Sequence, residues 1–189
     1  MLTAVVPVKS MDLAKSRLAG VLDATGRHAL ARQMLDHVLA TLREAGIGTV
    51  RVASGDDGQG DLNADVTVAA RLAAAEGATD LLLVMADLPY LAASDITALI
   101  EAGHKSAVVI AEAKDGGTNA LLLRPPTVLE FSFATSRPSA AFHADHARIV
   151  GIEPVLLRRP GLARDIDTPD DLAALAADHP AYRIFRHVA

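Results

Sequence analysis

Short apolar runs alternate with longer amphipathic stretches along this chain. Apolar runs occupy residues 2–8, 49–53 and 80–85, and each has the length of a strand. Between them, residues 24–45 and 64–76 carry apolar side chains at helical spacing. This alternation predicts right-handed parallel crossovers, and therefore an α/β protein with a mostly parallel sheet covered by helices.

The second half of the chain continues the pattern with one change of direction. Ser94 is expected to cap a helix that stops near Gly103, and a further helix should begin at Pro138 and Ser139. Thr168 should cap the last helix, which runs to about residue 177. The remaining expected strands are residues 107–111, 120–123 and 154–157. A short glycine-bearing loop joins the first two of these, which predicts that the sheet changes strand direction there.

The run 81–85 is followed by Ala86, Asp87, Leu88 and Pro89. An apolar run without alternation is typical of a strand that is buried on both faces. In open α/β sheets the ligand crevice lies beyond the carboxyl ends of such strands, which is where Asp87 falls. Asp87 is therefore a candidate metal ligand, although an Asp near a Pro after a strand is also ordinary turn chemistry.

Composition narrows the class of protein. With 189 residues and 51% hydrophobic content, the chain is expected to form one domain over residues 1–189. It has no cysteine, which excludes disulfides and thiolate metal sites and favours a cytoplasmic protein. Its net charge of −5 disfavours nucleic acid as a partner. No apolar stretch approaches the length of a membrane span and no basic leader precedes residue 2, so we expect neither membrane insertion nor targeting.

Three cations follow the first expected strand: Lys9, Lys15 and Arg17. They lie on a loop at the ligand end of the sheet, where cations suit a polyphosphate, although a solvated loop would also use charge for solubility alone. The spacings Gly-x-x-x-x-Gly-Lys and Gly-x-Gly-x-x-Gly are missing after this strand, which argues against a P-loop NTPase and a standard dehydrogenase.

Asp165 and Asp167 are two residues apart, so in an extended segment both point to one side while Ile166 points to the core. Mg²⁺ prefers a few carboxylates together with water and substrate phosphates, and Asp87 with this pair would supply them. The alternative is that the two acids only favour the N-terminus of the helix that begins after Thr168.

Two further segments could contact an anion. Gly117, Thr118 and Asn119 belong to a paired-glycine loop that could present backbone N–H groups, although such a pair is more often a simple turn. Ser139 and His143 would share one face of a helix whose N-terminus forms an anion site. A metal pair of His143 with His146 is a weaker interpretation than two surface histidines.

These residues together resemble one family, the guanylyltransferases of coenzyme F-420 biosynthesis, which join GTP to a small phosphorylated carboxylic acid. The resemblance covers nearly the whole chain in family order. It is carried by Val6-Pro7-Val8-Lys9, Ala14-Lys15-Ser16-Arg17-Leu18, Leu62-Asn63, Met85-Ala86-Asp87-Leu88-Pro89, Gly116-Gly117-Thr118-Asn119-Ala120-Leu121, Ser139 to His143, and Asp165-Ile166-Asp167-Thr168-Pro169-Asp170-Asp171-Leu172.

The resemblance implies a Rossmann-like nucleotidyltransferase fold and a set of site residues. It implies that Mg²⁺ is held by Asp87, Asp165 and Asp167. It places Lys9, Lys15 and Arg17 on the GTP phosphates as nucleotide-binding residues. It also implies that these three residues and Asp87 are catalytic. It places Leu62 and Asn63 beside the nucleotide. The acid substrate would lie near Gly117, Thr118, Asn119, Ser136, Ser139 and His143.

The chain departs from the family pattern at three places. Only a short loop separates the second strand from Leu62, so an edge helix and strand are expected to be missing. The segment from Phe133 to Pro138 lacks the glycine of an expected aromatic-glycine pair. Asp65 replaces a small apolar residue.

The function implied is transfer of GMP from GTP to the phosphate of an acid, with release of pyrophosphate. Phosphoenolpyruvate is favoured over 2-phospho-L-lactate and 3-phosphoglycerate, and a homodimer is a candidate assembly. The alternatives are a degenerate nucleotide-binding or regulatory module that has lost turnover, and a molybdopterin or sugar nucleotidyltransferase.

Overall fold

The structure is a computed structural model that describes residues 1–8, 15–54, 61–133 and 137–185. In this part of the chain a six-stranded sheet has the order β2-β1-β3-β5-β4-β6. Its strands are β1 (Leu2–Val8), β2 (Val50–Ser54), β3 (Asp80–Val84), β4 (Val108–Glu112), β5 (Thr118–Leu123) and β6 (Val155–Leu157). Strand β5 is antiparallel to both β3 and β4, whereas the other neighbouring pairs are parallel. The expected change of direction is therefore confirmed.

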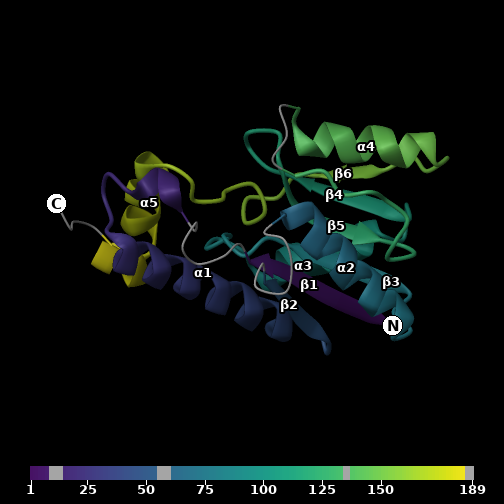
Figure 1. Cartoon of the computed structure of the whole chain (residues 1–189), viewed down its shortest axis with the longest axis horizontal. Helices are drawn as coiled ribbons and strands as arrows, with labels where there is room; N and C mark the ends of the chain where they lie inside the picture. Colours follow the sequence, from purple (N-terminus) through teal and green to yellow (C-terminus); the bar gives the residue numbers. More distant parts are fainter. Residues whose placement is uncertain (9–14, 55–60, 134–136, 186–189) are drawn as a thin grey trace.

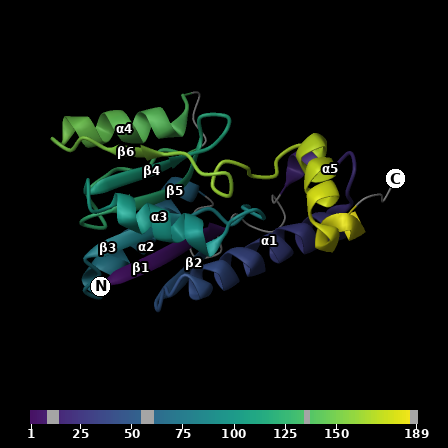
Figure 2. The ribbon, with the colours of Figure 1, turned by 180° about the vertical axis from the view of Figure 1, so that it is seen from behind.

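Helices cover both faces of the sheet, as Figures 1 and 2 show from opposite sides. One core cluster joins a sheet face to α2 (Leu62–Ala75) and α4 (Ser139–Ile149). A second cluster joins the other face to α1 (Ala24–Glu44) and α3 (Ala93–Ala102). The side chains of β3 from Leu81 to Val84 are fully buried between these layers. Burial of one such side chain contributes about 1.5–3 kcal/mol, which explains the unbroken apolar run.

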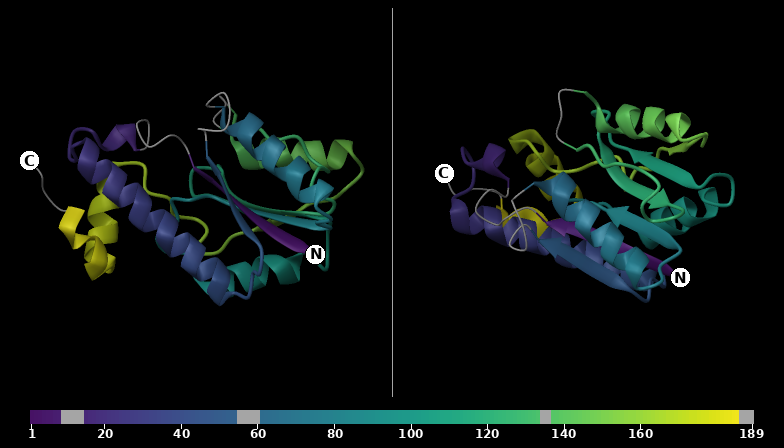
Figure 3. Two further views of the ribbon diagram at one scale, coloured as in Figure 1. Left: turned by 60° about the horizontal axis from the view of Figure 1, so that its bottom comes forward. Right: turned by 45° about the vertical axis from the view of Figure 1, so that its right-hand side comes forward.

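A third apolar cluster lies beyond the end of the sheet. It contains Leu30 and Met34 from the first half of α1, Leu172 from α5 (Pro169–Asp178), and Phe185 from the 3-10 helix η4 (Pro180–Phe185). Figure 3 shows α1 extending past the sheet toward α5. The short helix η2 (Ser16–Leu18) joins the same cluster through Leu18. The helix η2 is therefore anchored on α1 and α5.

Local sequence signals predicted most helix and strand ends to within two residues of those observed. Thr168 caps α5 by accepting from the Asp171 amide, and Gly46, with φ of 82°, follows the end of α1. The expectation for Ser94 is wrong, because the N-cap of α3 is Ala92, two residues earlier. The Asp95 carboxylate accepts from the Ala92 amide at 3.1 Å and supplies the capping contact instead.

Strand β2 forms one edge of the sheet in the described residues, and only residues 55–61 separate it from α2. This connection is too short for a helix and a strand, as expected. None of the described helices combines the length and apolar character that a membrane span requires.

Candidate functional site

Three carboxylates converge beyond the carboxyl end of β3. Asp87 follows this strand directly, and Asp165 and Asp167 lie on the loop between β6 and α5. One oxygen from each of the three lies within 4.8 Å of the others. Ile166 between the pair is buried in the third cluster, so the two neighbouring side chains point the other way. The alternation expected from the sequence is confirmed.

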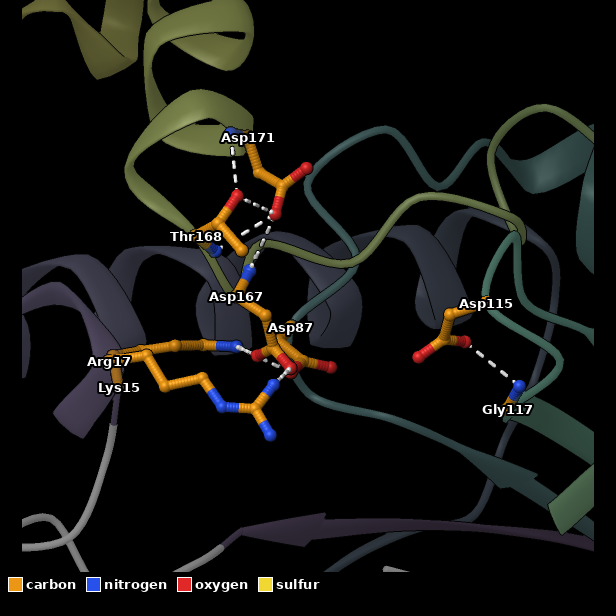
Figure 4. Close-up of polar contacts among 8 residues, drawn as sticks. All are labelled: Lys15, Arg17, Asp87, Asp115, Gly117, Asp167, Thr168 and Asp171. Carbon is orange, nitrogen blue, oxygen red and sulfur yellow. Dashed lines mark hydrogen bonds and ion pairs between the residues drawn. The ribbon is translucent and has the colours of Figure 1, made fainter. Parts of the chain in front are cut away.

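Lys15 lies between two of these carboxylates (Figure 4). Its Nζ atom is 2.6 Å from Oδ2 of Asp87 and 3.0 Å from Oδ1 of Asp167, and its side chain is only 9% exposed. Burial alone would lower the pKa of the ammonium group, but the charges of Asp87 and Asp167 raise it above its ordinary value. The residue has φ of 55°, in the left-handed region that non-glycine residues seldom adopt. Lys15 is thus a charged group that the surrounding structure holds in place.

Arg17 approaches the same cluster from the solvent side. Its Nη1 atom lies 3.1 Å from Oδ2 of Asp167, and its side chain is 73% exposed. The two cations therefore differ: Lys15 is enclosed, whereas Arg17 can turn toward a ligand at little cost. Lys15 is the N-cap of η2, and Arg17 lies within this short helix.

The carboxyl group of Asp165 is strongly perturbed by its surroundings. Burial, followed by the charges of Asp87 and Asp167, raises its pKa to about 6. A raised pKa means that nearby positive charge does not fully stabilise the ionised form of this carboxyl group. The oxygen donors of the cluster match the preference of hard divalent cations, so the residues present fit such an ion.

A pocket of about 330 Å³ opens beside the carboxylates. Its charged lining residues are Lys15, Arg17, Asp87 and Asp167, and its apolar lining residues include Pro7, Val8, Met34, Leu35, Leu62 and Met85. The lining therefore combines charged and apolar side chains. Such a pocket suits a ligand that has both a ring system and anionic groups.

A buried polar group lies at the start of β5. The Ser139 hydroxyl donates to Oγ1 of Thr118 at 3.0 Å, and the same oxygen lies 3.0 Å from Nδ1 of His143. All three side chains are buried. The amide of Met85 donates to the carbonyl of Asn119, so the start of β5 lies beside the end of β3. The hydroxyls expected near the acid substrate thus reach the same edge of the sheet as Asp87.

One known protein family matches almost the whole of this chain. The family described as "Guanylyl transferase CofC like" matches residues 2–180. The chain belongs to the CofC-like guanylyltransferase family. A phosphoenolpyruvate guanylyltransferase from Rubrobacter xylanophilus is 41% identical over 92% of this chain and 93% of its own length. One from Sphaerobacter thermophilus is 39% identical over 94% and 93%.

Solved structures show the same fold at low identity. A putative nucleotide-diphospho-sugar transferase from Desulfovibrio desulfuricans has a TM-score of 0.76 at 17% identity, covering 96% of this chain and 90% of its own. A 4-diphosphocytidyl-2C-methyl-D-erythritol synthase from Anaerococcus prevotii has a TM-score of 0.62 at 11% identity, covering 94% and 97%. The nucleotidyltransferase fold expected from the sequence is confirmed.

In this CofC-like chain, two asparagines of the matching motifs make contacts that the sequence did not indicate. The side chain of Asn63 accepts from the Phe133 amide at 2.7 Å, and its Nδ2 lies 3.5 Å from the Phe133 carbonyl. Asn119 donates from Nδ2 to the Leu162 carbonyl at 2.9 Å. In the described structure both side chains tether loops, and Asn119 tethers the one that carries Asp165.

The glycine loop is also internally satisfied. The Gly117 amide donates to Oδ1 of Asp115 at 2.8 Å (Figure 4), so this N–H is already occupied. Gly116 has φ of 84°, which requires glycine, and its carbonyl accepts from the Ala140 amide at the start of α4. The loop therefore sets the position of α4 relative to Thr118. Asp115 was not singled out from the sequence, although its place before two glycines is a typical turn signal.

The histidines differ from the sequence expectation. His143 is fully buried, so the surface interpretation is wrong for this residue. Its Nε2 accepts from the Ser132 amide, and Nδ1 of His146 accepts from the Glu130 amide at 3.1 Å. Both rings therefore bind one backbone segment rather than forming a metal pair. Lys9 and Ser136 lie outside the described residues.

Gly161 is a further residue that sequence reasoning missed. A Cβ atom at this position would lie 2.0 Å from Oδ2 of Asp95 and 2.6 Å from the carbonyl oxygen of Tyr90. The loop can therefore approach α3 only with glycine here. Arg159 reinforces this approach by binding Oδ1 of Asp95 at 2.9 Å. The signal in the sequence was a glycine directly after Pro160.

Proposed function

We propose that this chain transfers GMP from GTP to the phosphate of phosphoenolpyruvate and releases pyrophosphate, as a step of coenzyme F-420 biosynthesis. The observation that carries the proposal is the convergence of three carboxylates with Lys15 and Arg17, beside a pocket that both cations line together with Asp87 and Asp167. The two relatives named above are phosphoenolpyruvate guanylyltransferases and match over nearly their whole length, which supports this acceptor.

The pocket lining offers contacts for both parts of the nucleotide. Its apolar residues, which include Leu62 and Met34, would contact the guanosine. Its charged residues would contact the phosphates, with Arg17 supplying a fork of N–H donors and Lys15 a point charge. These contacts hold the α-phosphorus near the three carboxylates. Positioning of this kind is a large part of catalysis for reactions between two bound substrates.

Asp87, Asp165 and Asp167 would hold Mg²⁺, which when bound would supply positive charge to the non-bridging phosphate oxygens. Lys15 contributes to the same neutralisation from its enclosed position. The three carboxylates also favour an enzyme over a degenerate binding module, because a module that only binds nucleotide has less need of them.

The chemical step requires little of the protein beyond orientation. A phosphate oxygen of the acid attacks the α-phosphorus in line, forming a new P–O bond. The bond from the α-phosphorus to the bridging oxygen of the β-phosphate breaks, and pyrophosphate leaves with that electron pair. The attacking phosphate is already ionised near neutral pH, so no general base is assigned.

Further expectations follow from the sequence rather than from the site. We propose that residues 1–189 act as one guanylyltransferase domain. The lack of cysteine fits a reducing compartment such as the cytoplasm. A homodimer is a candidate assembly, which light scattering of the purified protein would test.

The proposal is tested with a panel of acceptors in the presence of GTP and Mg²⁺. Pyrophosphate release and the mass of the product should show transfer with phosphoenolpyruvate, and with phospholactate or phosphoglycerate only to a smaller extent. The same protein carrying Asp87→Asn should release almost none. GTP binding without release for every acceptor would instead support a binding module. Release only with sugar phosphates or molybdopterin would assign a different nucleotidyltransferase.

A further inference from the structure

His143 has a single possible tautomer in this structure. Its Nε2 atom lies 3.2 Å from the backbone nitrogen of Ser132, whose N–H can only donate. Nε2 must therefore be unprotonated and accept this bond. Burial, followed by the charge of His146, lowers the pKa of His143 to about 4, so the ring is neutral near pH 7. Its one proton is then on Nδ1.

This tautomer determines the direction of the hydrogen bonds at Thr118. The Nδ1–H group of His143 donates to Oγ1 of Thr118 at 3.0 Å. The Ser139 hydroxyl donates to the same oxygen at 3.0 Å. A hydroxyl oxygen has two acceptor positions and one proton. Both acceptor positions are thus filled, and no described residue accepts the remaining proton of Thr118.

The surroundings keep the His143 ring in this orientation. The ring of Phe133 packs against it with centroids 5.0 Å apart, and the ring of Phe142 packs edge-on at 5.7 Å. The His143 side chain is 0% exposed, so solvent does not compete for either nitrogen. Turning the ring over would place Cδ2–H beside Thr118 and Cε1–H beside the part-buried Ser132 amide, so both hydrogen bonds of the ring would be lost.

We propose that His143 is a positioning residue that makes the Thr118 hydroxyl an obligate donor to an anionic oxygen of the acid substrate. This rests on the proposed function, together with the family resemblance, which implies that the acid substrate lies near Thr118 and Ser139. A donor with no acceptor capacity left selects a carboxylate or phosphate oxygen. It rejects a group that itself must donate, such as the N–H of an amide, because two donors would then face each other.

Four variants test this through the kinetics with phosphoenolpyruvate. Thr118→Val removes the hydroxyl and should raise the KM for phosphoenolpyruvate about tenfold, the usual scale for a lost bond to a charged group, while the KM for GTP is unchanged. Thr118→Ser retains the hydroxyl and should recover most of that loss. His143→Leu should resemble Thr118→Val. His143→Asn, which keeps an N–H donor attached at Cγ, should lie between His143→Leu and the wild type.

The double variant Thr118→Val with His143→Leu separates positioning from a structural role. If His143 acts through Thr118, the double variant should show no higher KM for phosphoenolpyruvate than Thr118→Val alone. The proposal would be overturned if the rise in KM of the double variant equalled the product of the two single rises. A KM for GTP that rises in parallel would overturn it as well. His146→Leu is the matched control, since it also removes a side-chain acceptor from a backbone amide of residues 130–132 but has no contact with Thr118. It should leave the KM for phosphoenolpyruvate unchanged.

Long-range ¹H–¹⁵N NMR spectra of the wild type report which ring nitrogen carries the proton. His143→Asn assigns the His143 signal by its disappearance, and the proton should be on Nδ1. A proton on Nε2 would overturn the proposal without any assay of turnover. A wild type with no transfer to any acid would overturn the proposed function, and with it the substrate named here, while the tautomer itself would still be measured.

Discussion

The ammonium group of Lys15 lies 2.6 Å from the carboxylate of Asp87, although 72 residues separate the two in the sequence. The same group lies 3.0 Å from Asp167, so it occupies a position between two of the three converging carboxylates. A divalent cation bound by all three would compete with this lysine for the same oxygens. Lys15 therefore has two sets of partners available, the carboxylates and an incoming phosphate.

Lys15→Met should act in opposite directions on two ligands. Titration calorimetry of the nucleotide-free protein should show several-fold tighter Mn²⁺ binding, because the enclosed ammonium group between Asp87 and Asp167 is gone. The KM for GTP should rise about tenfold or more, since a charge-assisted hydrogen bond to phosphate is lost. Lys105→Met, at an exposed position outside the pocket, is the control and should change neither. Weaker Mn²⁺ binding would contradict this account of Lys15.

Arg17→Ala should separate ligand binding from stability. The Arg17 side chain is 73% exposed, and exposed ion pairs contribute less than about 1 kcal/mol, so the melting temperature should barely change. The KM for GTP should nevertheless rise about tenfold. Arg32→Ala removes a similar exposed ion pair, with Asp36 on α1, and should leave the KM for GTP as it is. A large loss of melting temperature in Arg17→Ala, with normal use of GTP, would show that this cation is structural.

Because burial lowers the pKa of His143, we expect the protein to lose stability in acid. The unfolded ring binds a proton near pH 6.5, whereas the folded ring, with its pKa lowered to about 4, does not. The unfolded state therefore takes up more protons over this interval, and the free energy of unfolding should fall by about 3 kcal/mol as the pH is lowered from 6.5 to 4.

Urea unfolding of the wild type and of His143→Leu across this interval isolates that contribution. The variant should be less stable at pH 7 but should lose less on acidification, because it has no ring to protonate. Equal losses in the two proteins would mean that other groups cause the acid sensitivity.

Gly161→Ala should disturb the carboxylate loop without touching the pocket. Its Cβ would meet the Tyr90 carbonyl and the Asp95 carboxylate at distances that no real contact allows, so the loop must move. We expect a loss of about 2 kcal/mol or more in unfolding free energy and a lower kcat. Gly48→Ala, where a Cβ would meet no atom within 4 Å, is the matched control. Normal stability and turnover in Gly161→Ala would show that the close approach to α3 is dispensable.

The sequence by itself determined the sheet and much of the carboxylate cluster. An apolar run without alternation fixes β3 as a buried strand, and parallel strands end at a common edge, so Asp87 was placed by rules that act over a few residues. The two-residue spacing of Asp165 and Asp167 similarly set their common direction. One error arose where several local residues could supply the same contact, as with Ser94 and Asp95 at the start of α3. The other concerned His143, whose burial depends on distant packing.

Only the tertiary structure decided which polar side chains meet a partner. Lys15 and Asp167 are 152 residues apart, and nothing in either segment signals that the lysine is enclosed between carboxylates. Asn63, Asn119 and His143 each bind backbone groups of distant loops, and no residue type marks a carbonyl or amide that will need a partner. The physical reason is that hydrogen-bond partners depend on where chains pack, while periodicity records only which face of an element is buried.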